Sequence, residues 1–229
     1  MRPSRLFIRL TLIVSALFAW AQTSEATTVE YSASGISMGQ PAFADVTITT
    51  ENNEIVVVFA NQEANPTSIS QSISGLLLGL GNTPSSVALS SSSGSLVDLS
   101  GGTFTSVSGP ITHWSAALSS GSVYLATAGT GAPGGQPSDL IIGPGPYTKA
   151  NSSFSNFQPQ IQDTATFYLS APGVTSATTI KSASIEFGTT PDAVLPGSIV
   201  NTPEPTSLLV LGSGIVGLGL LRRKPVVTA

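Results

Sequence analysis

Alternation of apolar and polar residues predicts that most of this chain forms β-strands. In residues 42–50 the small apolar side chains occupy every second position, as expected of a strand with one buried and one solvent-facing side. Residues 54–60 contain a continuous apolar run, which indicates a strand near the centre of a sheet. Asn52 and Asn53 join the two segments, and asparagine tolerates the backbone of a tight turn. Together they predict a β-hairpin.

Similar segments recur along the chain, separated by glycine, serine and proline. Further strands are expected at residues 28–34, 76–80, 87–89, 96–99, 103–107, 114–118, 123–126, 140–142, 164–170 and 178–187. Residues 65–75 differ, because Ile69 and Ile73 are four apart between Pro66 and Gly75, which predicts a short capping helix. The pattern predicts an all-β domain of sandwich or jelly-roll type over residues 27–190.

The N-terminal end departs from this pattern. Three arginines among the first nine residues precede an apolar run at residues 10–19, which is typical of a secretory signal peptide. Residues 19–21 (Ala-Trp-Ala) and 24–26 (Ser-Glu-Ala) both fit the small-residue rule for cleavage. We expect cleavage after Ala26, because the first site almost abuts the apolar run. An uncleaved N-terminal membrane anchor is the alternative.

The C-terminal end has three parts in a fixed order. Pro203-Glu204-Pro205 comes first, an uncharged apolar run follows at residues 208–221, and a basic cluster closes it at Arg222, Arg223 and Lys224. As a helix the apolar run would span about 21 Å, which is short against a hydrocarbon core of about 30 Å. Counted from Pro203 the length is about 28 Å, with the basic cluster on the cytoplasmic side.

This tail resembles the PEP-CTERM sorting signal of exopolysaccharide-producing bacteria. The resemblance implies that an exosortase, an intramembrane cysteine protease, cuts at the Pro-Glu-Pro and discards the transmembrane helix. Residues 191–202 would then be a tether, residues 203–224 the sorting signal and residues 225–229 a cytoplasmic tail. Implied partners are the exosortase-type protease, the secretion machinery, the membrane before processing and the exopolysaccharide. A plain C-terminal membrane anchor would explain the helix and the cations but not the Pro-Glu-Pro.

Composition narrows the choice of function for the remaining body. Most basic residues lie in the two end segments, so residues 27–202 keep only Lys149 and Lys181 against ten acidic residues. A net charge near −8 with no basic patch excludes nucleic acid as a partner. The absence of cysteine excludes disulfides, thiol catalysis and thiolate metal sites. We expect no cofactor.

The candidates for chemistry are few. His113 is the only histidine, no Gly-x-Ser-x-Gly elbow is present, and we expect this histidine to be structural and the protein not to be an enzyme. Asp98, Asp139 and Asp163 fall at strand ends or loops and are weak candidates for calcium, without the spacing of a calcium-binding loop.

Aromatic residues suggest a carbohydrate site as the best ligand hypothesis. Trp114, Tyr147, Phe154 and Phe157 could offer platforms for sugar rings, although filling the core explains the same residues. The sequence therefore predicts an exported structural or adhesive protein of the cell surface or exopolysaccharide matrix. The alternatives are a carbohydrate-binding module that recognises the exopolymer and a plain membrane-anchored envelope protein.

Overall fold

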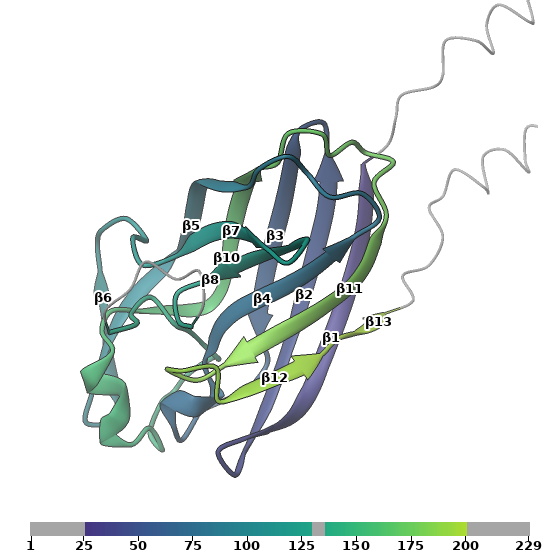
Figure 1. The fold of residues 1–229 in the computed structure, drawn as a ribbon. Helices are drawn as coiled ribbons and strands as arrows, with labels where there is room; N and C mark the ends of the chain where they lie inside the picture. The colour runs from purple at the N-terminus through teal and green to yellow at the C-terminus, as the bar shows by residue number, and fades with distance from the viewer. Residues whose placement is uncertain (1–25, 130–135, 201–229) are drawn as a thin grey trace, which may run out of the picture. The chain divides into compact units, whose positions relative to one another are not determined.

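The computed structural model describes residues 26–129 and 136–200 (Figure 1). The signal peptide up to residue 25, the Pro203-Glu204-Pro205 triplet and the expected transmembrane helix all lie outside these residues. Predictions for those segments are therefore carried by the sequence alone.

The described part of the chain is built almost entirely from strands. Two short 3₁₀ turns, η1 (Ile69–Gln71) and η2 (Ser152–Asn156), interrupt them. The strands are β1 (Thr27–Ser37), β2 (Gln40–Glu51), β3 (Glu54–Asn61), β4 (Ile73–Leu80), β5 (Ala88–Ser100), β6 (Thr103–Val107), β7 (Ser115–Ser119), β8 (Ser122–Ala126), β9 (Ile141–Ile142), β10 (Gln160–Ser170), β11 (Ile180–Phe187), β12 (Ala193–Pro196) and β13 (Ser198–Val200). The predicted all-β class is confirmed.

All thirteen described strands belong to one hydrogen-bonded sheet. Its main path runs β12-β11-β4-β9-β10-β3-β2-β1-β13, with β5 and β6 continuing from β10, and β8 and β7 continuing from β4. The two-residue β9 links the two parts, because it pairs with β4 on one side and β10 on the other. The strands are thus connected as one open sheet, whereas the predicted sandwich implies two separate sheets.

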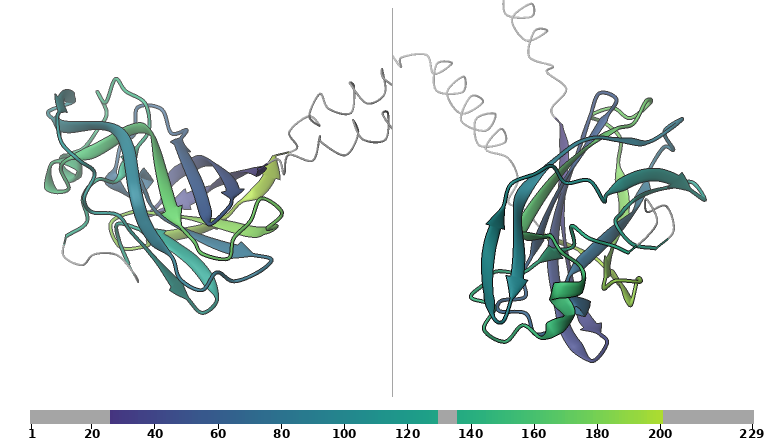
Figure 2. Two further views of the ribbon diagram at one scale, coloured as in Figure 1. Left: turned by 90° about the horizontal axis from the view of Figure 1, so that it is seen from above. Right: turned by 90° about the vertical axis from the view of Figure 1, so that its left-hand side faces the viewer.

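The sheet nevertheless folds over on itself around β9. We call β1, β2, β3, β10, β5 and β6 the first layer, and β4, β7, β8, β11 and β12 the second layer. The two layers lie across one another in the ribbon views (Figures 1 and 2), and the main core cluster takes side chains from both. Leu195 of β12 packs directly on Gly35 of β1, where a Cβ atom would lie 2.7 Å from the leucine. The absence of a side chain at Gly35 therefore lets the layers approach closely.

The hairpin predicted from alternation is present. Strands β2 and β3 pair from Ala44↔Asn61 to Glu51↔Glu54, and the turn places Asn53 at a φ of 60°. Val46 and Ile48 are fully buried between the layers, while Thr47 faces outward. Strand β3 lies between β2 and β10, so it occupies the central position that its apolar run predicts.

The predicted capping helix is much shorter than expected. Only Ile69–Gln71 is helical, as the 3₁₀ turn η1, and Ile73 already begins β4. The buried Gln71 side chain caps the start of this turn, because its Oε1 accepts hydrogen bonds from the backbone N–H groups of Thr67 (2.7 Å) and Ser68 (3.0 Å), and the backbone is already extended at Ser72. Gly75 is not a helix end: it pairs with Glu186 inside the sheet.

The expected tether is also largely folded. Most of residues 191–202 forms β12, which pairs with β11, and β13, which pairs with β1. Gly197, between the two strands, donates its N–H to the Ala183 carbonyl at 2.8 Å and packs against Tyr31. The compact unit closes at Ile199, so the folded body extends to within a few residues of the Pro-Glu-Pro.

We predict that Gln71→Ala lowers the free energy of unfolding by about 2 to 4 kcal/mol, because it leaves buried donors and acceptors unpaired. The side-chain Nε2 also donates to the Pro41 carbonyl at 2.9 Å, so one side chain joins β2 to the η1 turn. Urea unfolding of the two proteins measures the loss. Gln62→Ala, which removes an exposed bond to Asp45, is the control and should cost less than about 0.5 kcal/mol. Equal losses for the two variants would contradict the role assigned to Gln71.

Candidate functional site

The first layer presents a broad surface on the side away from the core, which we call the outer face. Its side chains alternate with the buried ones along each strand and are all half-buried or exposed. They are Thr28, Glu30, Ser32, Ser34, Phe43, Asp45, Thr47, Thr49, Glu51, Glu54, Val56, Val58, Ala60, Ser91, Ser93, Thr164, Thr166 and Tyr168. Most are hydroxyl-bearing or small, so the face carries few long side chains.

The strand register arranges these residues in rows across the sheet. One row follows the pairings Thr28↔Thr49, Thr49↔Val56, Val56↔Tyr168 and Tyr168↔Ser91. The next row is Glu30, Thr47, Val58, Thr166 and Ser93. Within the first row the hydroxyls of Thr28 and Thr49 lie 2.9 Å apart and share a hydrogen bond. The outer face is therefore an ordered array of short side chains across five strands.

Charge and aromatic residues give the outer face its chemical character. Glu30, Asp45, Glu51 and Glu54 are its charged members, and it contains neither lysine nor arginine. Phe43 is 42% exposed and Tyr168 is 38% exposed, so two rings are available on this surface. The outer face therefore offers hydroxyl groups for hydrogen bonding beside exposed rings for stacking. A protein surface that binds sugars uses both kinds of group.

The aromatic residues proposed from sequence as sugar platforms lie elsewhere. Trp114 is 4% exposed, Phe154 1% and Tyr147 0%, so these three rings are core residues. Trp114 packs against Phe59 and Phe167, with ring centroids 5.8 and 4.5 Å away. Burial of these large apolar rings stabilises the core, and a ring that is buried cannot be reached by a sugar. Phe157 is half-buried against the smaller core cluster that contains Tyr147 and Phe154.

A small hollow of mixed polar and apolar lining lies where η2 meets the β5–β6 turn. It has a volume of about 200 Å³, and its lining includes Gly101, Gly102, Asn151, Ser152 and Ser155. Phe104 follows close behind this turn, is 45% exposed, and meets Tyr147 edge-on with ring centroids 5.6 Å apart. Phe104 is not among the aromatic residues that the sequence pattern suggested as sugar platforms.

His113 is anchored by a buried carboxylate. Asp139 is 1% exposed and has a φ of 57°, and its Oδ2 accepts hydrogen bonds from the backbone N–H groups of Thr112 (2.8 Å) and His113 (3.0 Å). The same oxygen lies 3.1 Å from Nδ1 of His113, whose side chain is 44% exposed. The Asp139 carbonyl accepts the indole N–H of Trp114 at 2.8 Å. Asp139 therefore fixes three consecutive residues at once.

The three aspartates considered for calcium occupy different settings. Asp139 makes the bonds just described, Asp98 is half-buried on β5 opposite Thr105, and Asp163 lies at the irregularity of β10 with a φ of 60°. Burial raises the pKa of the Asp163 carboxyl. In the described residues, no three acidic or histidine side chains gather closely enough to hold a metal ion.

A buried acid pair that sequence reasoning missed joins β8 to β11. The Tyr124 hydroxyl donates to Oε2 of Glu186 at 2.6 Å, and the two side chains are 7% and 5% exposed. Burial raises the pKa of Glu186, and the hydrogen bond from Tyr124 partly opposes this rise. Burial also raises the pKa of Tyr124. Gly75 leaves the room this carboxylate needs, since a Cβ there would lie 2.6 Å from Oε2.

Comparison with known proteins identifies a sorting motif at the C-terminal end of the chain. Residues 201–224 match the family model described as the PEP-CTERM protein-sorting motif. The chain carries a PEP-CTERM sorting signal. This match covers the Pro203-Glu204-Pro205 triplet, the apolar run and the basic cluster, and so confirms the resemblance stated from sequence. No curated protein and no solved structure matches the chain.

The PEP-CTERM signal indicates how the protein is exported and processed, but it does not indicate the function of the folded domain. It supports an exported protein that is transiently anchored in the membrane and processed by an exosortase. Within residues 26–129 and 136–200, no helix has the length and apolarity needed to cross a bilayer.

We predict that Asp139→Ala lowers the free energy of unfolding by about 3 kcal/mol, because two backbone donors lose their acceptor. His113→Ala should cost less than about 1 kcal/mol, since that side chain is 44% exposed and its contact with Asp139 is open to solvent. Urea unfolding compares the two, with Asp139→Asn expected between them. A loss for His113→Ala as large as that for Asp139→Ala would mean that the ion pair dominates.

We predict that Glu186→Gln flattens the dependence of stability on pH. A carboxyl whose folded pKa is raised favours folding below its ordinary pKa of about 4.3 and loses that contribution as pH rises through the folded value. The wild type should therefore lose more Tm than Glu186→Gln between pH 4.5 and pH 7. Tyr124→Phe removes the bond that lowers the Glu186 pKa, so its loss should continue to higher pH. Parallel curves for all three proteins would refute the assignment.

Proposed function

We propose that the protein is a non-enzymatic structural or adhesive component of the cell surface or exopolysaccharide matrix. Exosortase processing near Pro203-Glu204-Pro205 would release the folded body there from its membrane helix. The outer face is the observation that carries this proposal, because it is wide, ordered and free of basic residues.

A sheet surface of this kind suits a polymer better than a small ligand. Short hydroxyl side chains in register can hydrogen-bond along an extended chain without first ordering long flexible side chains, which keeps the entropic cost low. Phe43 on β2 and Tyr168 on β10 can each stack on the apolar side of a sugar ring. Glu30 and Asp45 repel anionic polymers, so the favoured partner is a neutral polysaccharide.

The surroundings of His113 support a role other than catalysis. Its Nδ1 lies on a carboxylate that also holds two backbone N–H groups, and the neighbouring Trp114 is committed to the core. This arrangement is explained by the anchoring of a loop.

A discrete carbohydrate site is the second candidate. The hollow between Gly101, Gly102 and Asn151 offers backbone and amide groups, and the exposed Phe104 ring lies close by in the sequence. A module of this kind would bind a short oligosaccharide saturably, whereas the outer face would hold polymer and bind fragments weakly.

The test measures co-sedimentation of the processed protein with exopolymer extracted from the producing cells. Replacing both Phe43 and Tyr168 by serine should weaken binding about tenfold or more, because each stacking contact contributes about 1 kcal/mol. The matched variant Phe104→Ser with Asn151→Ala should bind as the wild type does.

Two other outcomes point to the alternatives. Loss of binding only in the Phe104 and Asn151 variant would favour the discrete site over the outer face. Intact-mass analysis of the native surface protein provides the second check. Protein that still extends to Ala229 and shows no affinity for polymer would be a plain membrane-anchored envelope protein.

A further inference from the structure

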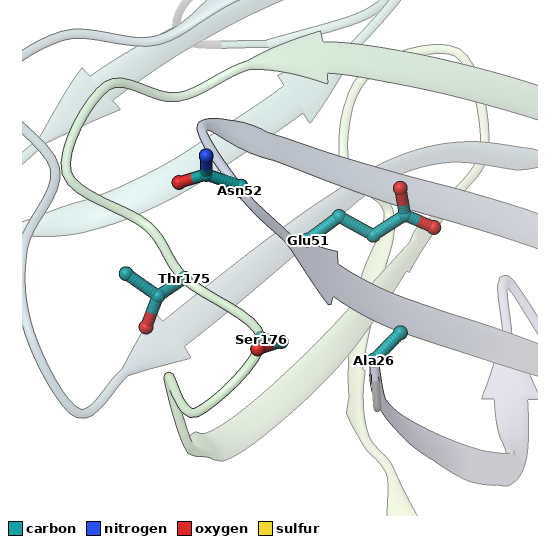
Figure 3. Close-up of a pocket in the computed structure, with 5 residues that line it drawn as sticks. All are labelled: Ala26, Glu51, Asn52, Thr175 and Ser176. Carbon is teal, nitrogen blue, oxygen red and sulfur yellow. The ribbon is translucent and has the colours of Figure 1, made fainter. Parts of the chain in front are cut away.

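An open hollow lies where the described chain begins. Ala26, Glu51, Asn52, Thr175 and Ser176 line it, and its volume is about 480 Å³ (Figure 3). The residues come from the start of β1, the β2–β3 turn and the loop that leads from β10 to β11. The hollow therefore surrounds the point at which the predicted signal peptide joins the domain.

The strand register places the predicted cleavage site beside a carboxylate. Thr27 pairs with Thr50, so Ala26 comes opposite Glu51 at the next position. Thr50 points inward, where its hydroxyl donates to the Thr178 carbonyl, and Glu51 consequently points to the other side, toward solvent. Directly opposed residues on one side of an antiparallel pair have Cβ atoms about 5 Å apart. Figure 3 shows the Glu51 carboxylate and Ala26 at the same end of the hollow.

A second carboxylate makes this corner strongly acidic. Glu51 pairs with Glu54 across the two-residue turn, so both side chains emerge on the same side of the hairpin. Directly opposed like charges destabilise a strand pair. Among the described residues the only ion pair is His113–Asp139, and the lysines there are Lys149 and Lys181, so neither glutamate has a cationic partner.

We propose that the α-ammonium group of Thr27, formed when the signal peptide is removed, is the cation that Glu51 binds, with Glu54 adding to the negative potential of the corner. Hydrolysis breaks the Ala26–Thr27 peptide bond. Water supplies the hydroxyl of the new Ala26 carboxyl group and a proton to the Thr27 nitrogen. Near neutral pH the amine binds a further proton, because α-amino groups have a pKa of about 7.7 to 8.0. The proposal rests on cleavage after Ala26 and is independent of polymer binding.

The fold holds the new terminus in place for this contact. Thr27 is the first residue of β1, and its hydroxyl donates to the Ser176 carbonyl at 2.5 Å. The nitrogen of Thr27 is therefore fixed at the edge of the hollow rather than carried on a loose end. An ordered terminus loses little entropy when it forms an ion pair, which favours pairing even at an exposed site.

Maturation then changes the electrostatics of the domain. In the uncleaved chain the Glu51 carboxylate lies beside a neutral peptide bond, and in the mature chain it lies beside a positive charge. The other charged groups on the adjoining elements are Glu30 on β1, Asp45 on β2, Asp163 on β10, and the exposed Lys181 and buried Glu186 on β11, while residues 174–179 contain none. The ion pair raises the pKa of the terminal amine, so its stabilising effect is present below about pH 8 and is lost as pH rises through the folded value.

The test uses the mature protein purified from the producing cells, with its N-terminus fixed first by intact mass. An NMR titration of the ¹⁵N-labelled terminal amine should give a pKa about half a unit higher in wild type than in Glu51→Gln. Between pH 7 and pH 10 the wild type should lose about 1 to 3 °C more Tm than Glu51→Gln. Glu30→Gln is the control and should keep most of the wild-type pKa rise.

The contrary results are distinct. A mature N-terminus at any residue other than Thr27 would overturn the proposal outright. With Thr27 confirmed, an amine pKa that is the same in wild type and Glu51→Gln would overturn the assignment of the carboxylate. Neither result bears on whether the outer face binds polymer, so the two proposals fail separately.

Discussion

The contact of Phe59, Phe167 and Trp114 between the two layers is the interaction on which the structure depends. The chain has no cysteine, so apolar packing must hold the layers together without covalent help. Phe59 and Phe167 meet edge-on at 5.9 Å across adjacent strands, and Trp114 packs against both. Because the indole N–H donates to the Asp139 carbonyl, the same ring also fixes the loop that carries His113.

That packing explains why the opposite side of the first layer has its particular chemistry. A strand that sends every second side chain into the core leaves the alternate positions for solvent. In β2 and β10 those positions are filled by threonine, Phe43, Tyr168 and the acidic Asp45 and Glu51, and in β5 by serine. The outer face is therefore the geometric counterpart of the core. Altering its residues should change surface chemistry while leaving the buried contacts in place.

Local patterns in the sequence predict part of this fold and fail where distant residues decide. The β2–β3 hairpin follows from alternation and two asparagines, since all the required information lies within adjacent residues. The short η1 turn depends on Gln71 reaching the Pro41 carbonyl on another strand, which no local pattern reveals. Likewise, Leu195 lies in a segment rich in proline and glycine, which does not predict a strand. It packs in β12 against Gly35 of β1, where the absence of a side chain leaves room for it.

The candidate site shows the same division. Residue type alone does not separate a ring that fills the core from a ring that faces solvent, so it points to Trp114 and Tyr147 and misses Phe43 and Tyr168. The alternation in β2 already placed Phe43 on the solvent side, and that was the available signal. The bonds of Asp139 to Thr112 and His113 could not be inferred, because they depend on backbone donors that are distant in sequence.

Strand β13 ends at Val200, and this limits the length of chain between the folded body and the Pro-Glu-Pro. Only Asn201 and Thr202 separate it from Pro203, a stretch of chain no longer than about 7 Å. An enzyme embedded in the bilayer that cuts at the triplet must therefore work almost against the folded body. The product of such a cut would have only a few residues beyond β13, and so little unfolded C-terminal peptide for an exopeptidase to bind.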